Sequence, residues 1–211
     1  MLVVSLSGGS GSGKTTLAKQ IASKFPAGLI NLLPIDAYYK DHSHLSAAEK
    51  MVHNFDHPDS IDFELLIEHL RKLKMSIPIE MPVYSFITCS RENSNIKVQP
   101  SEILIIEGLM ALTNEQLRAE TDVKIYLDVA EANRFERIIE RDITERGRSR
   151  EMSMERFYKM VQPMHESFIE PYKFSADVII DGNNPNITAI STSIVQIIGK
   201  YMYHANCQSL D

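Results

Sequence analysis

The sequence predicts an α/β fold in which a parallel sheet of about five strands carries helices on both faces. Three observations lead to this prediction. Five short segments are apolar and rich in β-branched residues, as strands buried on both faces usually are. Longer segments with apolar residues at helical spacing alternate with them. A glycine-rich segment joins the first predicted strand to the first predicted helix.

The predicted strands and helices alternate along the chain, as the crossover connections of a parallel sheet require. The predicted strands are Leu2–Leu6, Gly28–Leu33, Ile103–Ile106, Val123–Leu127 and Val178–Ile180. The predicted helices are Thr15–Phe25, Ile61–Leu73, Ala130–Glu145 and Ile187–Met202. Pro26 is expected to close the first helix, because proline cannot continue one. The pair Asp59-Ser60 is the expected N-cap of the second helix, since short polar side chains accept hydrogen bonds from the first turn.

Residues 77–99 interrupt this alternation. They contain Pro78, Pro82 and the β-favouring pair Val83-Tyr84, and they have no helical period. We expect a small β-hairpin here, inserted between the second and third predicted strands. Apart from this insertion the pattern is continuous, so residues 1–211 are expected to form a single domain.

The composition narrows the classes of function. Hydrophobic residues make up 44% and charged residues 24% of the chain, which excludes disordered and fibrous proteins. A net charge of −6 disfavours a nucleic-acid polymer as partner. Cys89 and Cys207 cannot form a disulfide framework and fit a reducing compartment. Because no signal-peptide pattern or bilayer-length apolar run occurs, we expect a soluble, cytoplasmic protein without a membrane partner.

The glycine-rich segment carries the strongest functional signal. Residues 8–15, GGSGSGKT, satisfy the pattern G-x-x-x-x-G-K-[ST] between a strand and a helix. Glycines let consecutive backbone N–H groups turn toward phosphate oxygens, and the helix N-terminus adds a positive dipole end. Lys14 supplies a point charge for the phosphates, and Thr15 a hydroxyl for Mg²⁺. The residues expected to bind nucleotide are Gly8, Gly9, Ser10, Gly11, Ser12, Gly13, Lys14, Thr15 and Thr16.

Two carboxylates follow predicted strands. Glu107 ends the third strand, before a glycine, where the acid of a P-loop protein holds Mg²⁺ directly or through water. Asp36 lies just beyond the second strand and is placed to accept the proton of an acceptor hydroxyl and to touch the metal shell. Aspartates at strand ends often only cap turns, and the residues alone leave that alternative open for Asp36.

The remaining motifs favour a kinase over a molecular switch. The N-K-x-D and D-x-x-G sequences of GTPases do not occur. A kinase needs cations for the transferred phosphoryl group, and arginine forks bind phosphate well. We therefore predict an arginine-rich lid over about residues 137–160, with a solvated basic helix face as the alternative. The arginines concerned are Arg134, Arg137, Arg141, Arg146, Arg148 and Arg150.

On these and further stretches the chain resembles the uridine/cytidine kinases. The matching stretches, in order, are GGSGSGKTT, IDAYYKD, NFDHPDSIDFELL, PVYSFITCSR, ILIIEGLMAL, RDITERGR, QPMHESFIEP and ADVII. The resemblance implies a P-loop NTPase-type fold with the hairpin over the acceptor site. It also implies a homotetramer that uses ATP or GTP with Mg²⁺ to phosphorylate the 5′-hydroxyl of uridine or cytidine in pyrimidine salvage.

The resemblance also implies roles for single residues. Asp36 is implied to be the catalytic base and a ligand of the metal shell, together with Thr15 and Glu107. Lys14, Arg141 and Arg146 are implied to contact phosphates. The residues implied to bind the nucleoside are Asp56 on the ribose hydroxyls, Tyr39, Phe55, Tyr84 and Phe86 as aromatic walls, and Cys89, Arg148 and Arg156.

The chain departs from the family pattern in the implied acceptor pocket. Cys89 stands where the family has a histidine that reads the base, and Ser85 where it has an aspartate. Ile138 replaces a second arginine, and Arg156 replaces a glutamine that helps to grip the base. A thiol is a weak hydrogen-bonding group, so polar readout of the base is reduced.

These departures keep two other functions open. One is a related kinase for another nucleoside, a sugar phosphate or a pantothenate-like acceptor, and the other is a nucleotide-binding sensor without turnover. The choice between ATP and GTP is also open. The histidines at 42, 44, 53 and 57 have no cysteine or H-E-x-x-H partner, so solvated loop residues are a simpler interpretation than zinc ligands.

Overall fold

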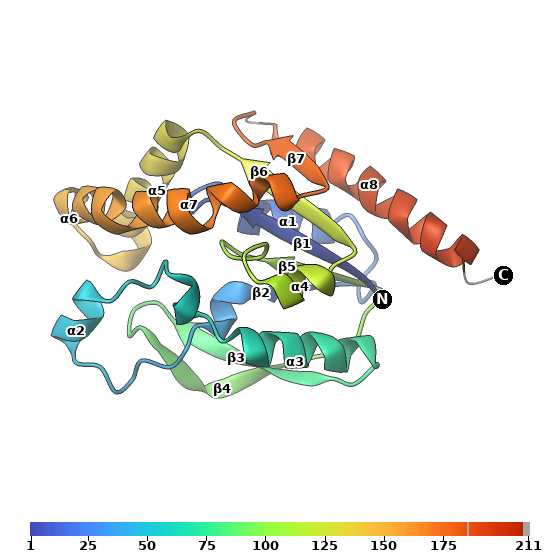
Figure 1. The fold of residues 1–211 in the computed structure, drawn as a ribbon, viewed down its shortest axis with the longest axis horizontal. Coiled ribbons are helices and arrows are strands. Elements are labelled where there is room, and N and C mark those ends of the chain that lie inside the picture. The colour runs from blue at the N-terminus through green and yellow to red at the C-terminus, as the bar shows by residue number, and fades with distance from the viewer. Residues whose placement is uncertain (185, 209–211) are drawn as a thin grey trace.

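The computed structural model describes residues 1–184 and 186–208 and confirms the predicted parallel sheet. Its strands are β1 (Leu2–Gly8), β2 (Ile30–Pro34), β5 (Ile103–Glu107), β6 (Val123–Asp128) and β7 (Val178–Asp181). They lie in the order β2-β5-β1-β6-β7, and every pairing is parallel (Figure 1). The β1 strand is therefore central, and the segment that follows it leaves from the middle of the sheet.

Helices cover both faces of this sheet (Figure 1). The helices of the described residues are α1 (Lys14–Ala22), α2 (Ala47–Val52), α3 (Phe63–Lys74), α4 (Glu115–Ala119), α5 (Glu131–Arg146), α6 (Arg150–Arg156), α7 (Gln162–Phe168) and α8 (Ile187–Gln208). Of these, α1 and α8 pack on one face of the sheet and α3 on the other. The four predicted helices correspond to α1, α3, α5 and α8. No helix among the described residues combines the length and the apolar character that crossing a bilayer requires.

Alternating strand residues divide the core into two layers, because successive side chains of a strand point to opposite faces. Val4 packs in one layer with Leu17 of α1 and Ile194 of α8. Val3 packs in the other with Leu70 of α3. The sheet is thus apolar on both faces, as the continuous apolar strands predict.

Three predicted helix boundaries are wrong. The α8 helix continues beyond the predicted Met202 to Gln208. The α1 helix ends at Ala22, before Pro26, because the chain turns there and the Ser23 hydroxyl bonds back to the Gln20 carbonyl. The α3 helix begins at Phe63, and its N-cap is Asp62 rather than the Asp59-Ser60 pair. The Asp62 carboxylate accepts the Leu65 N–H at 3.1 Å.

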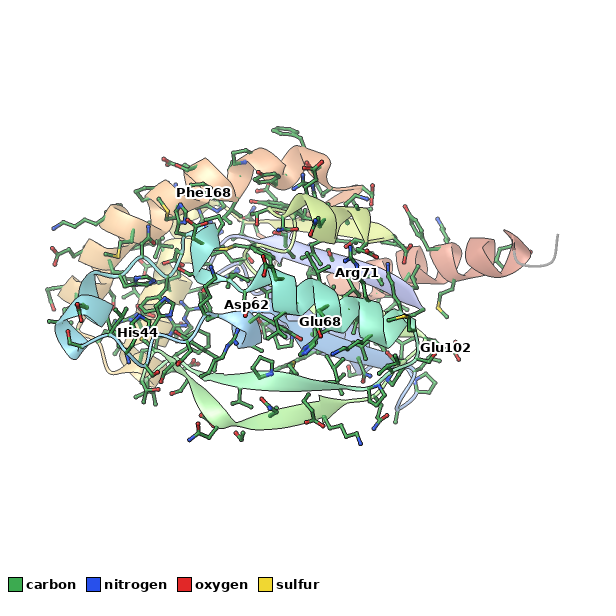
Figure 2. The ribbon with its side chains drawn as sticks, turned by 60° about the horizontal axis from the view of Figure 1, so that its bottom comes forward. His44, Asp62, Glu68, Arg71, Glu102 and Phe168 are labelled. Carbon is green, nitrogen blue, oxygen red and sulfur yellow. The ribbon has the colours of Figure 1, made fainter. Side chains whose placement is uncertain are left out.

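The expected hairpin forms a sheet of its own beside α3 (Figure 1). Its antiparallel strands are β3 (Ile79–Ser85) and β4 (Ser90–Val98). The backbone at Cys89 has a φ of 50°, a left-handed conformation that costs a non-glycine residue energy, and it lies directly before β4. Figure 2 shows Asp62 at the start of α3, where the hairpin approaches the helix. The side chain of Cys207 lies outside the described residues.

Candidate active site

The loop between β1 and α1 needs glycine at defined places. Gly11 and Gly13 have φ values of 77° and 88°, which side-chain-bearing residues rarely adopt. A Cβ at Gly11 would lie 2.5 Å from the Arg134 carbonyl oxygen, and one at Gly9 would lie 2.8 Å from the Arg134 Cδ. The loop therefore rests directly on α5, and substitution at either glycine would lift it away.

Arg134 and Arg137 hold this loop from behind. Arg134 is 2% exposed and donates to the Val129 carbonyl and to Gln162 Oε1, at 3.2 and 3.0 Å. Arg137 Nη1 donates to the Ser12 carbonyl at 3.2 Å. Arg134, predicted from the sequence as one of the cations for the phosphoryl group, is instead buried under the loop by its place on the inner face of α5.

The loop leaves polar groups without protein partners at the start of α1. No side chain among the residues described caps this helix, so its first N–H groups can bind an anion. The Ser12 hydroxyl is buried and has no hydrogen-bond partner among the described residues. A side cavity opens next to it, lined by Ser12, Gly13, Thr16, Leu17, Leu127, Arg137, Gly182, Asn184, Ile187 and Ile190.

Thr15 and Glu107 meet as the sequence predicts. Thr15 Oγ1 donates to Glu107 Oε2 at 3.1 Å, from the first turn of α1 to the end of β5. Glu107 is 4% exposed, and burial is the main cause that raises its pKa, while the nearby Lys14 acts in the opposite direction. A buried carboxylate beside a threonine hydroxyl is a set of oxygen donors that suits Mg²⁺.

The main cavity brings most predicted site residues together. It is lined by Ser10, Lys14, Asp36, Tyr39, Phe55, Asp56, Tyr84, Phe86, Cys89, Leu109, Arg141, Arg146, Arg148 and Arg156. Asp36 lies in the helical turn Ile35–Tyr38 that follows β2, at the carboxyl edge of the sheet. The cavity therefore runs from the phosphate loop, past a carboxylate, to a group of aromatic rings.

The aromatic rings form one contiguous wall. The Tyr39 ring centroid lies 5.0 Å from that of Tyr84 and 6.3 Å from that of Phe55, and Tyr84 and Phe86 lie 5.4 Å apart. The Tyr84 hydroxyl is buried without a hydrogen-bond partner among the described residues, so it can still serve a bound molecule.

Arg91 lies outside the cavity and connects the segments that carry this aromatic wall. Its Nε donates to the Tyr39 carbonyl at 2.8 Å, and its Nη2 bonds to Asp62 Oδ2 at 3.1 Å. Its backbone N–H donates to Asp41 Oδ1 at 3.2 Å. The hairpin is thereby attached to both the Tyr39 segment and the start of α3.

An ion pair crosses the cavity between segments that are 100 residues apart. Arg156 Nη2 lies 2.6 Å from Asp56 Oδ2, and the two side chains are 20% and 10% exposed. The Asp56 N–H donates to Asn54 Oδ1, which shapes the turn that presents the carboxylate. Asp56 thus reaches the cavity as predicted, with one of its oxygens already bonded.

Three arginines at the end of α5 surround one buried carboxylate. Asp142 is fully buried, and Arg148, Arg146 and Arg141 lie 2.8, 3.5 and 3.7 Å from its oxygens. The Arg146 guanidinium lies 4.9 Å from the centre of the Phe86 ring. Burial, followed by the charge of Arg141, lowers the pKa of Arg146 to about 10, so it stays cationic at neutral pH.

Besides Arg134 and Arg137, the residues singled out from the sequence that do not line the main cavity include Arg150 and Ile138. Arg150 pairs with Glu136 at 3.9 Å on the outside of α5, because its place in α6 turns it away. Ile138 is 1% exposed in a small core with Phe157 and Val161. Ile138 itself therefore does not line the cavity.

Two residues at the site, Leu109 and Asp142, escape sequence reasoning. Leu109 lines the cavity, and its place just after Glu107 at a strand end is a signal that could have found it. For Asp142 the comparable signal is its place as an acidic residue in a segment rich in arginines. Nothing in the sequence distinguishes the buried Arg134 from its exposed neighbours on the helix.

The histidines behind the wall are less solvated than predicted. His42 is 7% exposed, and its ring lies 4.4 Å from that of His53. The His53 ring lies 4.6 Å from Phe55, and burial, then the charge of His42, lowers the pKa of His53. The prediction of solvated loop histidines is wrong for His42, because Phe55 and His53 pack around it.

Comparison with known proteins places this geometry in a family. The model of the phosphoribulokinase/uridine kinase family matches residues 3–189. The chain is 43% identical to a uridine kinase of Anoxybacillus flavithermus and 44% identical to one of Halalkalibacterium halodurans, over 93% of both partners in each case. The fold is also that of the phosphoribulokinase of Rhodobacter spheroides, with a TM-score of 0.61 at 16% identity, over 87% of this chain and 73% of that one. The chain therefore belongs to the phosphoribulokinase/uridine kinase family.

Proposed function

We propose that this chain is a nucleoside kinase that transfers the γ-phosphoryl group of ATP or GTP to the 5′-hydroxyl of uridine or cytidine. The product is UMP or CMP, as in pyrimidine salvage. One observation carries the proposal: a single cavity joins the phosphate-binding Lys14 and the carboxylate of Asp36 to a wall of aromatic rings. The relatives named above are uridine kinases, which supports uridine as the acceptor.

The phosphate end would hold the donor. The N–H groups of the loop and of the start of α1 bind phosphate oxygens, and Lys14 adds a cation. The side cavity beside Thr16 receives the donor base, between Arg137 and the apolar Ile187. Its lining of both apolar and amide side chains does not favour ATP over GTP.

The acceptor end would hold the nucleoside. Asp56 accepts a hydrogen bond from the ribose hydroxyls through the oxygen that Arg156 leaves free. The rings of Tyr39, Tyr84 and Phe86 provide flat apolar faces against which a pyrimidine base stacks. Phe55 closes this wall on the other side of Tyr39.

Transfer then takes place between the two ends. Asp36 accepts the proton of the 5′-hydroxyl while that oxygen bonds to the γ-phosphorus and the bond to the leaving diphosphate oxygen breaks. Lys14, Arg141 and Arg146 bind the phosphoryl oxygens on which charge develops. Arg148 and Arg156 approach the nucleoside from the lid side.

The residues present fit a magnesium ion. The hydroxyl of Thr15 and the carboxylate of Glu107 are in contact, and Asp36 is close enough to Glu107 to raise its pKa. Thr15, Glu107 and Asp36 would hold the ion directly or through water. Bound there, Mg²⁺ supplies positive charge to the donor phosphates.

Cys89 and Arg156 favour a second candidate function, in which the kinase acts on a different acceptor. Both line the acceptor end, where they replace the family's histidine and glutamine. A guanidinium at this place binds the carbonyl or phosphate oxygens of an acceptor more strongly than a glutamine would. The homotetramer and the cytoplasmic location stay predictions.

The test is an ADP-release assay with Mg²⁺-ATP across uridine, cytidine, other nucleosides, ribulose 5-phosphate and pantothenate. We expect saturable turnover with uridine or cytidine and a requirement for the metal. Turnover only with another acceptor would replace the proposed substrate. Tight ATP binding without turnover on any acceptor would identify a sensor instead. Repeating the assay with GTP settles the donor.

A further inference from the structure

Asp142 is the most deeply buried carboxylate next to the main cavity among the described residues, yet it does not line it. In the part of the chain that the structure describes, its carboxylate pairs only with the arginines at the end of α5, and each of these arginines lines the cavity. Arg148 Nη1 donates to Asp142 Oδ2 at 2.8 Å, a charge-assisted hydrogen bond. Oδ1 has no hydrogen bond from any residue that the structure describes, and it faces Arg146 and Arg141 at 3.5 and 3.7 Å.

The backbone brings the three arginines to this carboxylate. Arg146 follows Asp142 by four residues and lies on the same side of α5. Gly147 ends the helix with a φ of 63°, and the chain reverses there. The Arg148 N–H then bonds back to the Asp142 carbonyl at 3.1 Å, which returns the Arg148 side chain to the carboxylate.

The mutual repulsion of the three arginines gives a physical reason for a carboxylate between them. Three guanidinium groups beside one another repel, and their repulsion grows as water is excluded. Arg141 and Arg148 are among the charges that lower the pKa of Arg146. The carboxylate in their midst offsets this repulsion. A hydrogen bond also fixes the direction of the Arg148 guanidinium.

We propose that Asp142 is the positioning residue of the transfer reaction, which aims Arg141, Arg146 and Arg148 into the cavity without touching the reacting groups. This inference rests on the proposed function, because it assumes that these arginines act on a phosphoryl group and its acceptor. Catalytic side chains act best when neighbouring groups fix their orientation before the substrates bind. Asp142 supplies that orientation from outside the cavity.

The kinetic test is Asp142→Asn, which keeps the size of the side chain and removes its charge. We expect kcat with uridine to fall by about 10- to 100-fold, as misplacement of catalytic groups does, with the KM for ATP changed less than threefold. The matched control is Glu145→Gln, an exposed acid on the same helix, whose kcat is expected to stay at the wild-type value.

A double-mutant cycle separates positioning from a general structural effect. Asp142→Asn and Arg148→Lys should be strongly non-additive in kcat, since each removes the same interaction. Asp142→Asn and Arg156→Gln should be nearly additive, because Arg156 pairs with Asp56 instead. Additivity in both cycles would overturn the proposal, as would a kcat of Asp142→Asn equal to that of the wild type.

A readout that needs no acceptor keeps this test apart from that of the proposed function. In ¹⁵N-arginine-labelled protein, the Nη protons of Arg148 should give separate signals, because its bond to Asp142 hinders rotation. Arg148→Lys identifies these signals, and Asp142→Asn should merge them. If Asp142→Asn does not fold, Asp142→Glu serves, and an unchanged kcat with it counts against the proposal. Averaged signals in the wild type would also overturn it, whatever acceptor the enzyme uses.

Discussion

The two ends of the main cavity are built in opposite ways. The phosphate end is one continuous loop, residues 8–15, with the strand-end Glu107 beside it. Backbone geometry and close packing of Gly9 and Gly11 on Arg134 fix it. The acceptor end gathers side chains from residues 39 to 156, and partly exposed ion pairs and ring contacts join them.

This difference shows where the sequence of such a kinase is free to change. No side chain larger than hydrogen fits at Gly11, so the phosphate end tolerates no change there. At the acceptor end one side chain can replace another while the backbone stays as it is. The departures at Cys89 and Arg156 both lie at this end, and the one at Ile138 is in the core.

The largest effect is expected where the two ends meet. Asp36→Asn should lower kcat by about 10²- to 10⁴-fold, because asparagine cannot accept the proton of the acceptor hydroxyl. Binding of ATP should be nearly unchanged, since the loop is built without Asp36. Steady-state kinetics and calorimetric titration with ATP measure the two quantities.

The control for Asp36 is Asp59→Asn, whose side chain is 89% exposed and lies outside the cavity. It should behave as the wild type does. If Asp36→Asn kept its turnover, Asp36 would be a turn cap and not the base.

A smaller effect, confined to the acceptor end, is expected from Arg156. Arg156→Ala leaves Asp56 without its partner and should raise the KM for uridine roughly tenfold, as loss of a partner for a charged group costs about 1–3 kcal/mol. Arg156→Gln can still donate one hydrogen bond and should change this KM less. The KM for ATP should stay constant in both variants.

Lys159→Gln is the matched control, a basic side chain 71% exposed and one turn further along the chain. An equal rise of both KM values in Arg156→Ala would mean that the ion pair supports the whole fold. The contrast between the two ends would then not hold.

The smallest effect concerns pH. Burial lowers the pKa of His53 below its ordinary value of 6.5, so the packed wall favours the neutral ring. The ring in the unfolded or detached segment titrates near 6.5. Its contribution to stability is therefore complete above pH 6.5 and is lost as the pH falls below that value. We expect the KM for uridine to rise roughly three- to tenfold between pH 7 and pH 5.5.

This pH effect should be absent in His53→Gln, which cannot be protonated. His44→Gln should keep it, because His44 is exposed in the loop before α2 (Figure 2). A pH dependence that His53→Gln leaves unchanged would assign the effect to another group.

Much of the fold could be read from the sequence because its signals are local. Apolar β-branched runs and helical spacing reveal strands and helices, and crossover helices make the sheet parallel. The boundaries of α1 and α3 could not be predicted from these local signals. Asp62 rather than Asp59 caps α3, since its second oxygen also binds Arg91 from the distant hairpin.

By itself the sequence determined the phosphate loop and the places of Thr15 and Glu107 near it. These follow from motif spacing, because neighbouring residues on a loop or at strand ends must lie near one another. The residues of the acceptor end were predicted only through the resemblance to the uridine/cytidine kinases. Only the tertiary structure decided which group each arginine contacts. Arg134 supports the loop, Arg150 turns outward and Arg156 pairs with Asp56. Their helical spacing is similar, but burial and the nearest carboxylate differ for each, and those depend on segments far away in the chain.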